Sequence, residues 1–180
     1  MKKRVVIGLI LVVVLVLAAA SQASAGAERI EVSTVEYDCF TGFTEDGGMW
    51  GEDAAVTHVR GILHTNVNVS RTPQLNGLHH TVADGDINNV AGTAVIRGSS
   101  VWEPEGIDGA WVGHWTVTYN KNHGSGHGTW RGTGALQGKM LFLDVYDGEP
   151  DGQLEAMCDG IGAPEGYVRT VGYILEVPAP

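Results

Sequence analysis

Basic residues are scarce in this sequence. Among its 180 residues, 11 are Lys or Arg and 21 are Asp or Glu, which gives a formal net charge of −10. Nucleic acids and anionic lipid headgroups are bound through cationic side chains that neutralise their charge. The shortage of such side chains therefore argues against both nucleic acid and a membrane surface as partners.

Cysteine is also scarce, and the two cysteines present, Cys39 and Cys158, lie far apart in the chain. There is no Cys-x-x-Cys pair, so neither a dithiol redox motif nor a thiolate zinc site is indicated. An even number of cysteines in an exported chain favours a disulfide. We therefore predict a Cys39–Cys158 bridge, with two separate buried thiols as the alternative.

A long hydrophobic run occurs only near the N-terminus. The positively charged residues 2–4 precede an apolar run over 5–20, and Ala23 and Ala25 supply the small residues of a cleavage site. This pattern predicts a signal peptide over residues 1–25. An uncleaved anchor is the alternative, because the run is only slightly short for a membrane span.

Cleavage after Ala25 would leave residues 26–180 as a single domain that is secreted or periplasmic and has no membrane association. This mature chain keeps 8 basic and 21 acidic residues, a formal net charge of −13.

Apolar residues at helical spacing are missing from the mature chain, where frequent glycines interrupt every candidate helix. Short runs of alternating apolar and polar residues, bounded by Gly, Pro, Asn and Asp, recur instead, which is typical of an all-β sandwich or barrel. The predicted strands are 30–37, 57–69, 75–83, 90–101, 110–119, 128–136, 139–146, 153–158 and 167–177.

Eight to ten such strands, joined by short polar turns, predict an all-β fold, and we favour an antiparallel eight-stranded β-barrel over an open sandwich. Closure into a barrel removes exposed strand edges. The first and last strands would then pair, and the predicted disulfide would lie near this closing seam.

The clearest alternation runs from Ala110 to Tyr119. Trp111, Trp115 and Tyr119 share one face of this strand, and His114 lies on the opposite, more polar face. We predict that the three aromatic rings point into the barrel.

Two patterns that suggest a metal site are weak. Asp84-x-Asp86-x-Asn88 begins like a calcium loop, but it lacks the glycine and the glutamate that an EF-hand needs at its sixth and twelfth positions. A polar turn is the simpler interpretation. The seven histidines show no zinc-ligand spacing, so the sequence predicts neither a metal site nor a cofactor.

The segment from Gly124 to Gly138 is the most distinctive part of the sequence. Gly126, Gly128, Gly132, Gly134 and Gly138 fall at even positions, which removes side chains from one face of a strand and lets neighbouring groups approach closely. The segment contains Gly-x-Gly but lacks the following helix and Lys-Ser/Thr pair of a phosphate-binding loop.

This segment resembles the glycine-rich hairpin of allene oxide cyclase and dirigent-type barrels, on the basis of Gly128, Trp130, Gly132 and Gly138. The resemblance implies an eight-stranded antiparallel barrel with an apolar interior that binds or cyclises hydrophobic small molecules. It covers about 25 residues and assigns no catalytic residue to this chain.

Three functions remain open on sequence grounds. The first is a non-enzymatic barrel that binds a hydrophobic small molecule or is purely structural. The second is a barrel cyclase or isomerase acting on such a molecule, and the third is a surface module that contacts carbohydrate. The candidate residues for a ligand cavity are Trp111, Trp115, Tyr119, Trp130, His114 and Arg131.

Overall fold

The computed structural model describes residues 27–52, 54–121, 123–148 and 152–176. The predicted signal peptide over residues 1–25 lies outside these ranges. Within them, no helix has the length and apolar character needed to cross a membrane.

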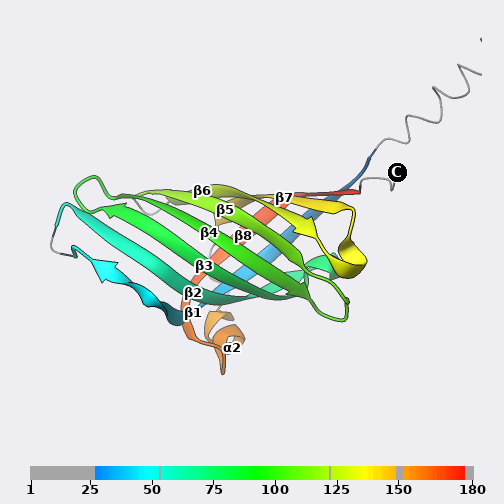
Figure 1. Cartoon of the computed structure of the whole chain (residues 1–180), viewed down its shortest axis with the longest axis horizontal. Coiled ribbons are helices and arrows are strands. Elements are labelled where there is room, and N and C mark those ends of the chain that lie inside the picture. The colour runs from blue at the N-terminus through cyan, green and yellow to red at the C-terminus, as the bar shows by residue number, and fades with distance from the viewer. Residues whose placement is uncertain (1–26, 53, 122, 149–151, 177–180) are drawn as a thin grey trace, which may run out of the picture.

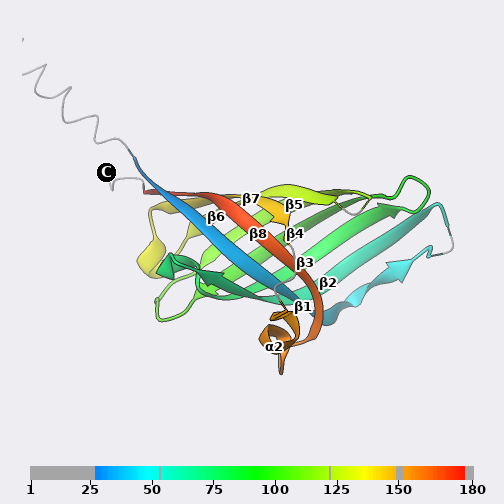
Figure 2. The ribbon, with the colours of Figure 1, turned by 180° about the vertical axis from the view of Figure 1, so that it is seen from behind.

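Eight antiparallel strands follow one another around a closed barrel, and the last strand pairs with the first (Figures 1 and 2). The predicted barrel is thereby confirmed. The strands are β1 (Glu28–Trp50), β2 (Val56–Ser70), β3 (Gly77–Asn88), β4 (Thr93–Pro104), β5 (Trp111–Asn120), β6 (His123–Gly132), β7 (Lys139–Asp147) and β8 (Ala163–Glu176).

The two ends of the barrel differ. The connections β2–β3 and β6–β7 contain short 3₁₀ helices, η1 (Pro73–Leu75) and η2 (Gly134–Leu136), and we call this the closed end. The hairpins β1–β2, β3–β4 and β5–β6 lie at the opposite end, which we call the open end (Figure 1). Leu75 of η1 and Leu136 of η2 are both buried, so the two 3₁₀ helices help to fill the closed end.

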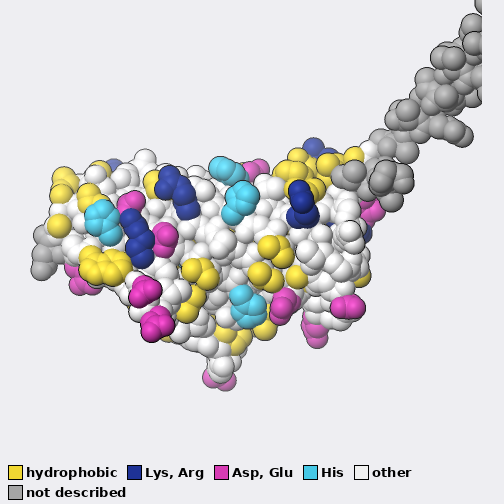
Figure 3. Space-filling model, viewed as in Figure 1, with side chains coloured by type: hydrophobic (Ala, Val, Ile, Leu, Met, Phe, Trp, Pro, Cys, Tyr) yellow, Lys and Arg dark blue, Asp and Glu magenta, His cyan; other side chains and the backbone are white. Residues whose placement is uncertain are grey.

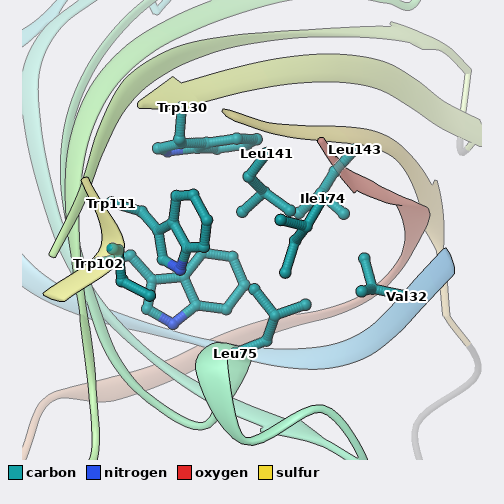
Figure 4. Close-up of a cluster of buried hydrophobic side chains, with 9 residues drawn as sticks. Val32, Leu75, Trp102, Trp111, Trp130, Leu141, Leu143 and Ile174 are labelled. Atoms are coloured by element: carbon teal, nitrogen blue, oxygen red, sulfur yellow. The ribbon is translucent and has the colours of Figure 1, made fainter. Parts of the chain in front are cut away.

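An apolar core occupies the closed half of the barrel interior (Figure 4). We call this set of buried side chains the closed-end core: Val32, Leu75, Trp102, Trp111, Trp130, Leu136, Leu141, Leu143 and Ile174. The indole N–H groups of two of them also have acceptors, because Trp111 donates to the carbonyl of Gln74 at 2.9 Å and Trp130 donates to Ser100 Oγ at 2.8 Å. Burial of three tryptophans makes this half the main source of hydrophobic stabilisation.

The glycine-rich segment forms most of β6, and its glycines make room for aromatic rings. A Cβ atom at Gly128 would lie 2.1 Å from the ring of Trp130. On β4, a Cβ atom at Gly98 would lie 2.5 Å from the ring of Trp115. A larger residue at either position would displace a tryptophan, so the close approach expected from the even spacing is present.

The inward face of β2 changes along the strand. Its pairing with β3 is interrupted between Val59 and Ile62, beside Gly61, which has a φ of 64°. A bulge of this kind inserts a residue and reverses which side chains point inward. As a result Asn66 is buried and Val69 is 46% exposed. An uninterrupted alternation that continued from the buried Val59 would place Val69 inside the barrel and Asn66 outside.

Two local predictions are wrong. Residues 153–158 were expected to form a strand, but Leu154–Cys158 form the helix α2, whose Leu, Glu, Ala and Met residues favour helix. Asp84 and Asp86 were expected in a turn and instead lie within β3. Their carboxylates are occupied there, since Asp84 accepts a hydrogen bond from the Gly61 N–H and Asp86 pairs with Arg60.

The predicted disulfide is confirmed: Cys39 and Cys158 are bridged, with their Cα atoms 5.4 Å apart. The bridge ties α2 to the outer side of β1, close to the seam where β1 pairs with β8 (Figure 1). Both cysteines are buried, and a buried disulfide is compatible with an extracytoplasmic protein.

The outer surface is mixed in character. On the face seen in Figure 3, hydrophobic side chains lie in several small groups among charged and polar ones. Val82, Val101 and Val112 are exposed on neighbouring strands β3, β4 and β5.

Candidate functional site

The open half of the barrel interior contains a cavity of about 250 Å³. Inward-facing side chains from all eight strands line it, and it borders the closed-end core at Trp130 and Leu143. Its apolar wall includes Ile62, Ile96 and Val117. A space of this volume suits a small organic molecule.

Polar side chains gather on one side of this cavity. We call Glu36, Asp38, Asn66 and His79 the cavity cluster; they come from β1, β2 and β3. Asn66 Nδ2 donates to Glu36 Oε1 at 2.7 Å, and His79 Nδ1 lies 3.1 Å from Glu36 Oε2. Because an ionised carboxylate can only accept hydrogen bonds, His79 Nδ1 carries the hydrogen in this pair.

The two carboxyl groups of the cluster have pKa values displaced in opposite directions. Burial by itself raises the pKa of Glu36, but attraction to His79 and hydrogen bonds from His79, Asn66 and Asp38 outweigh it, so the pKa is lowered. Burial, followed by the negative charge of Glu36, holds the pKa of Asp38 well above its ordinary value. The cluster therefore favours an ionised Glu36 beside a protonated Asp38.

His79 is held firmly in the wall of the cavity. Its ring stacks on Trp102, with centroids 5.0 Å apart, and meets Trp130 edge-on at 5.9 Å. Its other ring nitrogen, Nε2, is buried and has no hydrogen-bond partner among the described residues. The imidazole is thus fixed in position by Glu36 and the two indoles, and its Nε2 is buried without a partner among the described residues.

Further buried polar atoms of the cavity wall lack partners within the described part of the chain. They are Asn66 Oδ1, Thr81 Oγ1, Trp115 Nε1 and Thr170 Oγ1. Buried polar groups in proteins nearly always have a partner, since leaving one without costs about 1–3 kcal/mol. With His79 Nε2, five such atoms belong to residues that line this one cavity.

Other titratable groups line the cavity wall. His64 on β2 pairs with Glu165 on β8, and the His64 ring packs against Phe40. Tyr119 on β5 also lines the cavity. Burial, aided by the nearby carboxyl groups, raises the pKa of Tyr119 to about 12, which keeps its hydroxyl protonated and able to donate.

The predicted cavity residues divide into two groups. Trp115, Tyr119 and Trp130 line the cavity, and Trp111 points inward into the closed-end core, so the inward orientation of the aromatic face of β5 is confirmed. His114 and Arg131 lie exposed on the outer face, and their placement in the cavity lining is corrected. Adjacent residues of a strand point to opposite faces, so neither can join its inward-facing neighbour.

None of the four residues of the cavity cluster was among those predicted from the sequence to line a ligand cavity. Thr34, Glu36 and Asp38 follow each other at two-residue spacing on β1, which was the available signal of a polar inner face. His79 and His80 point to opposite faces of β3, with His79 3% exposed and His80 on the outside. Asn66 is brought to the cluster by the bulge in β2, which the alternation along this strand does not reveal.

Within the described ranges, no group of three or more His, Cys, Asp or Glu residues is arranged to hold a metal ion. Asp84 and Asp86 are occupied by the contacts within the sheet described above. The cavity lining thus combines acidic side chains with buried polar atoms, His79 Nε2 among them, that have no partner in the described part of the chain.

No protein-family model, no curated protein and no solved structure matches this chain.

Proposed function

We propose that this protein binds a small, uncharged and mostly apolar molecule inside its barrel. The observation that carries the proposal is the cavity of about 250 Å³, whose apolar walls surround a cluster of buried polar atoms without partners. A barrel filled only for stability would close this space with side chains, as the closed-end core does. A ligand that hydrogen-bonds to these atoms would offset the free energy that their burial costs.

The charges of the lining define what kind of molecule fits. Among the described residues that line the cavity, none is Lys or Arg, whereas Glu36, Asp38 and Glu165 are acidic. A carboxylate or phosphate placed inside would meet an ionised Glu36 with no cation to balance it. A cation would find no free carboxylate, because Glu36 is occupied by Asn66 and His79 and Glu165 is paired with His64. The ligand is therefore uncharged, with one polar group directed at the cavity cluster.

The test uses 1-aminoanthracene, a flat, neutral fluorophore with a single amine. We expect saturable binding to the mature chain, seen as an increase and blue shift of its emission. Val117→Trp places an indole in the cavity, and we expect it to weaken binding at least about tenfold, equivalent to about 1.4 kcal/mol. Val112→Trp is the matched control, because Val112 lies on the outer face of the same strand.

Absence of saturable binding, or equal loss of binding in both variants, would contradict the proposal. A melting curve of each variant shows whether the barrel remains folded.

A second candidate function is a cyclase or isomerase that acts on a hydrophobic small molecule. It is favoured by the pairing of a lowered pKa at Glu36 with a raised pKa at Asp38, since oppositely displaced carboxyl groups in one cavity are typical of acid–base catalysis. The resemblance of the glycine-rich segment to allene oxide cyclase and dirigent-type barrels agrees with this candidate.

The carbohydrate-binding alternative is less well supported. A sugar-binding surface needs a row of exposed aromatic rings. Among the described residues, Trp50 and Phe43 on β1 and Tyr146 on β7 are exposed, and these two strands are not neighbours in the barrel.

We also propose that the protein is secreted or periplasmic, on the basis of the predicted N-terminal signal and the disulfide. Intact-mass analysis of the exported protein should give Gly26 as its first residue, and a chain retaining Met1 in a membrane fraction would contradict this.

A further inference from the structure

Glu36 has no free oxygen with which to take a proton from a ligand. Its Oε1 accepts from Asn66, its Oε2 faces His79 Nδ1, and Asp38 contributes a further hydrogen bond to the carboxylate. Glu36 therefore acts on a ligand only through its neighbours. The buried atom of the cavity cluster that is both basic and without a partner among the described residues is His79 Nε2.

The Glu36–His79 pair has the arrangement that makes an imidazole an effective proton acceptor. The carboxylate holds the hydrogen on Nδ1, which leaves the lone pair on Nε2. When Nε2 accepts a proton, the imidazolium that forms lies directly beside an ionised carboxylate and is stabilised by it. The stacked Trp102 ring keeps the imidazole from turning.

A hydrogen-bond donor lies beside this nitrogen on the same strand. Thr81 follows His79 by two positions on β3, so their Cα atoms lie about 7 Å apart and both residues line the cavity. Thr81 is 3% exposed, and its hydroxyl has no partner in the described part of the chain. A ligand lying along this stretch of β3 would place a C–H group at His79 and the oxygen of a carbonyl on the adjacent carbon at Thr81.

We propose that His79 Nε2 is the proton-accepting atom of this cavity and that the substrate is a compact, uncharged ketone with a hydrogen on the carbon next to its carbonyl. The proposal rests on the ligand-binding function proposed above and deepens it. Glu36 is a positioning residue for His79, and Thr81 donates to the ketone oxygen.

The reaction needs no external reagent. The Nε2 lone pair takes the hydrogen as a proton, the C–H bond breaks, and its electron pair forms a carbon–carbon double bond while the carbonyl π electrons move to oxygen. Thr81 stabilises the resulting enolate by its hydrogen bond. The imidazolium then returns the proton, either to the same carbon or, in an unsaturated ketone, to a more distant carbon, which moves the double bond.

The test uses phenacyl bromide, a small ketone with bromide on the carbon next to the carbonyl. If His79 Nε2 faces that carbon, a nitrogen–carbon bond forms there and bromide leaves. We expect saturable labelling at His79, located by peptide mapping, with protection by acetophenone. The exposed residues His58, His80 and His114 are internal references and should react more slowly and without saturation.

Four variants separate a role in the reaction from a purely structural role. Glu36→Gln should lower the maximal labelling rate at His79 by about tenfold or more, with little change in the concentration that gives half the maximal rate. Thr81→Val should lower the maximal rate several-fold, whereas Thr118→Val on the outer face of β5 should leave it unchanged. In deuterium oxide, the wild-type protein should also accelerate exchange of the acetophenone methyl hydrogens, and His79→Asn should not.

The outcomes distinguish this proposal from the preceding one. If 1-aminoanthracene binds but His79 remains unlabelled while the exposed histidines react, the cavity binds ligands and the role of His79 is overturned. Labelling that does not saturate, or that is indifferent to Glu36→Gln, overturns it as well. If 1-aminoanthracene does not bind, the ligand-binding function itself fails.

Discussion

The closed half of the barrel interior is filled by indole rings and aliphatic side chains, whereas the open half holds carboxyl groups, an amide and an imidazole around an empty space. In the closed half, the N–H groups of Trp111 and Trp130 have acceptors. Outside the cavity lining, the buried polar side-chain atoms without a partner among the described residues are Trp102 Nε1 and the amide atoms of Asn68. In the open half, several buried polar atoms have no partner among the described residues. Both halves belong to the same eight strands, so the contrast lies in the side chains that alternate inward.

This contrast indicates that the two halves contribute unequally to stability and function. Burial of apolar surface stabilises the closed half, while burial of polar groups without partners weakens the open half. Departures from good packing that carry a stability cost are expected at functional sites. The four predictions below test this division, from the largest expected change in unfolding free energy to the smallest.

The largest loss should come from the closed-end core. Trp111→Ala removes a fully buried ring and the hydrogen bond to the Gln74 carbonyl, and it should cost about 3–5 kcal/mol of unfolding free energy. The matched control is Trp50→Ala at the open end, where the ring is largely exposed, and the cost should be below about 1 kcal/mol. Urea unfolding measures both. Similar costs for the two variants would mean that the core is not the main stabilising region.

The disulfide should rank second. The double variant Cys39→Ser with Cys158→Ser opens a loop of 119 residues and releases α2 from β1, so it should lose about 2–4 kcal/mol. Reduction of the wild-type protein should produce a loss of similar size. If the double variant unfolds at the same urea concentration as the wild type, the bridge does not stabilise the barrel near its seam.

Trimming the cavity wall should have a smaller effect. Val117→Ala removes two methyl groups beside a space that is already empty, so we expect a loss of about 1 kcal/mol, less than deletions in a tightly packed core. Val112→Ala on the outer face of the same strand should change stability by less than about 0.5 kcal/mol. A Val117→Ala loss as large as that of Trp111→Ala would show that the open half is as tightly packed as the closed half.

The last prediction has the opposite sign. Because the pKa of Asp38 is raised in the folded protein, folding is favoured at low pH, and stability is lost as pH rises from the unfolded pKa through the folded one. Asp38→Asn removes this loss and keeps a donor for Glu36, so the variant should be more stable than the wild type at neutral pH. The difference should disappear below the ordinary aspartate pKa of 3.8.

The effect is measured by urea unfolding between about pH 3.5 and pH 8, a range that brackets the ordinary aspartate pKa of about 4. The control is Asp144→Asn, because Asp144 lies on the exposed face of β7. A variant that is less stable than the wild type at neutral pH would contradict the raised pKa.

Much of the architecture could be predicted from local pattern. The alternation of Trp111, Trp115 and Tyr119 correctly indicated which face of β5 points inward. Gly126, Gly128 and Gly132 correctly indicated a strand face against which other groups pack closely. Gly134 and Gly138 were expected to continue this face, but they lie beyond β6 and have positive φ angles. The disulfide was predictable because only two cysteines exist. These features depend on the two-residue period of a strand and on side-chain size, both of which can be read from neighbouring residues.

The site was less predictable, because it depends on contacts between residues distant in sequence. His114 and Arg131 were sought in the cavity and lie outside it, whereas Glu36, Asp38, Asn66 and His79 form the polar cluster. A weak alternation over residues 153–158 suggested a strand. These residues instead contain the helix α2, which the bridge to Cys39 holds against β1.

The sequence by itself determined the strand-rich fold, the inward face of β5 and the acidic character of the chain, because each follows from residue type and short-range spacing. Only the tertiary structure decided that a polar cluster would face an open cavity. A single bulge beside Gly61 turns Asn66 inward, and barrel closure brings Asn66 and His79 to Glu36. Register and closure are properties of the whole sheet, so a shift of one residue in one strand changes which side chains meet inside.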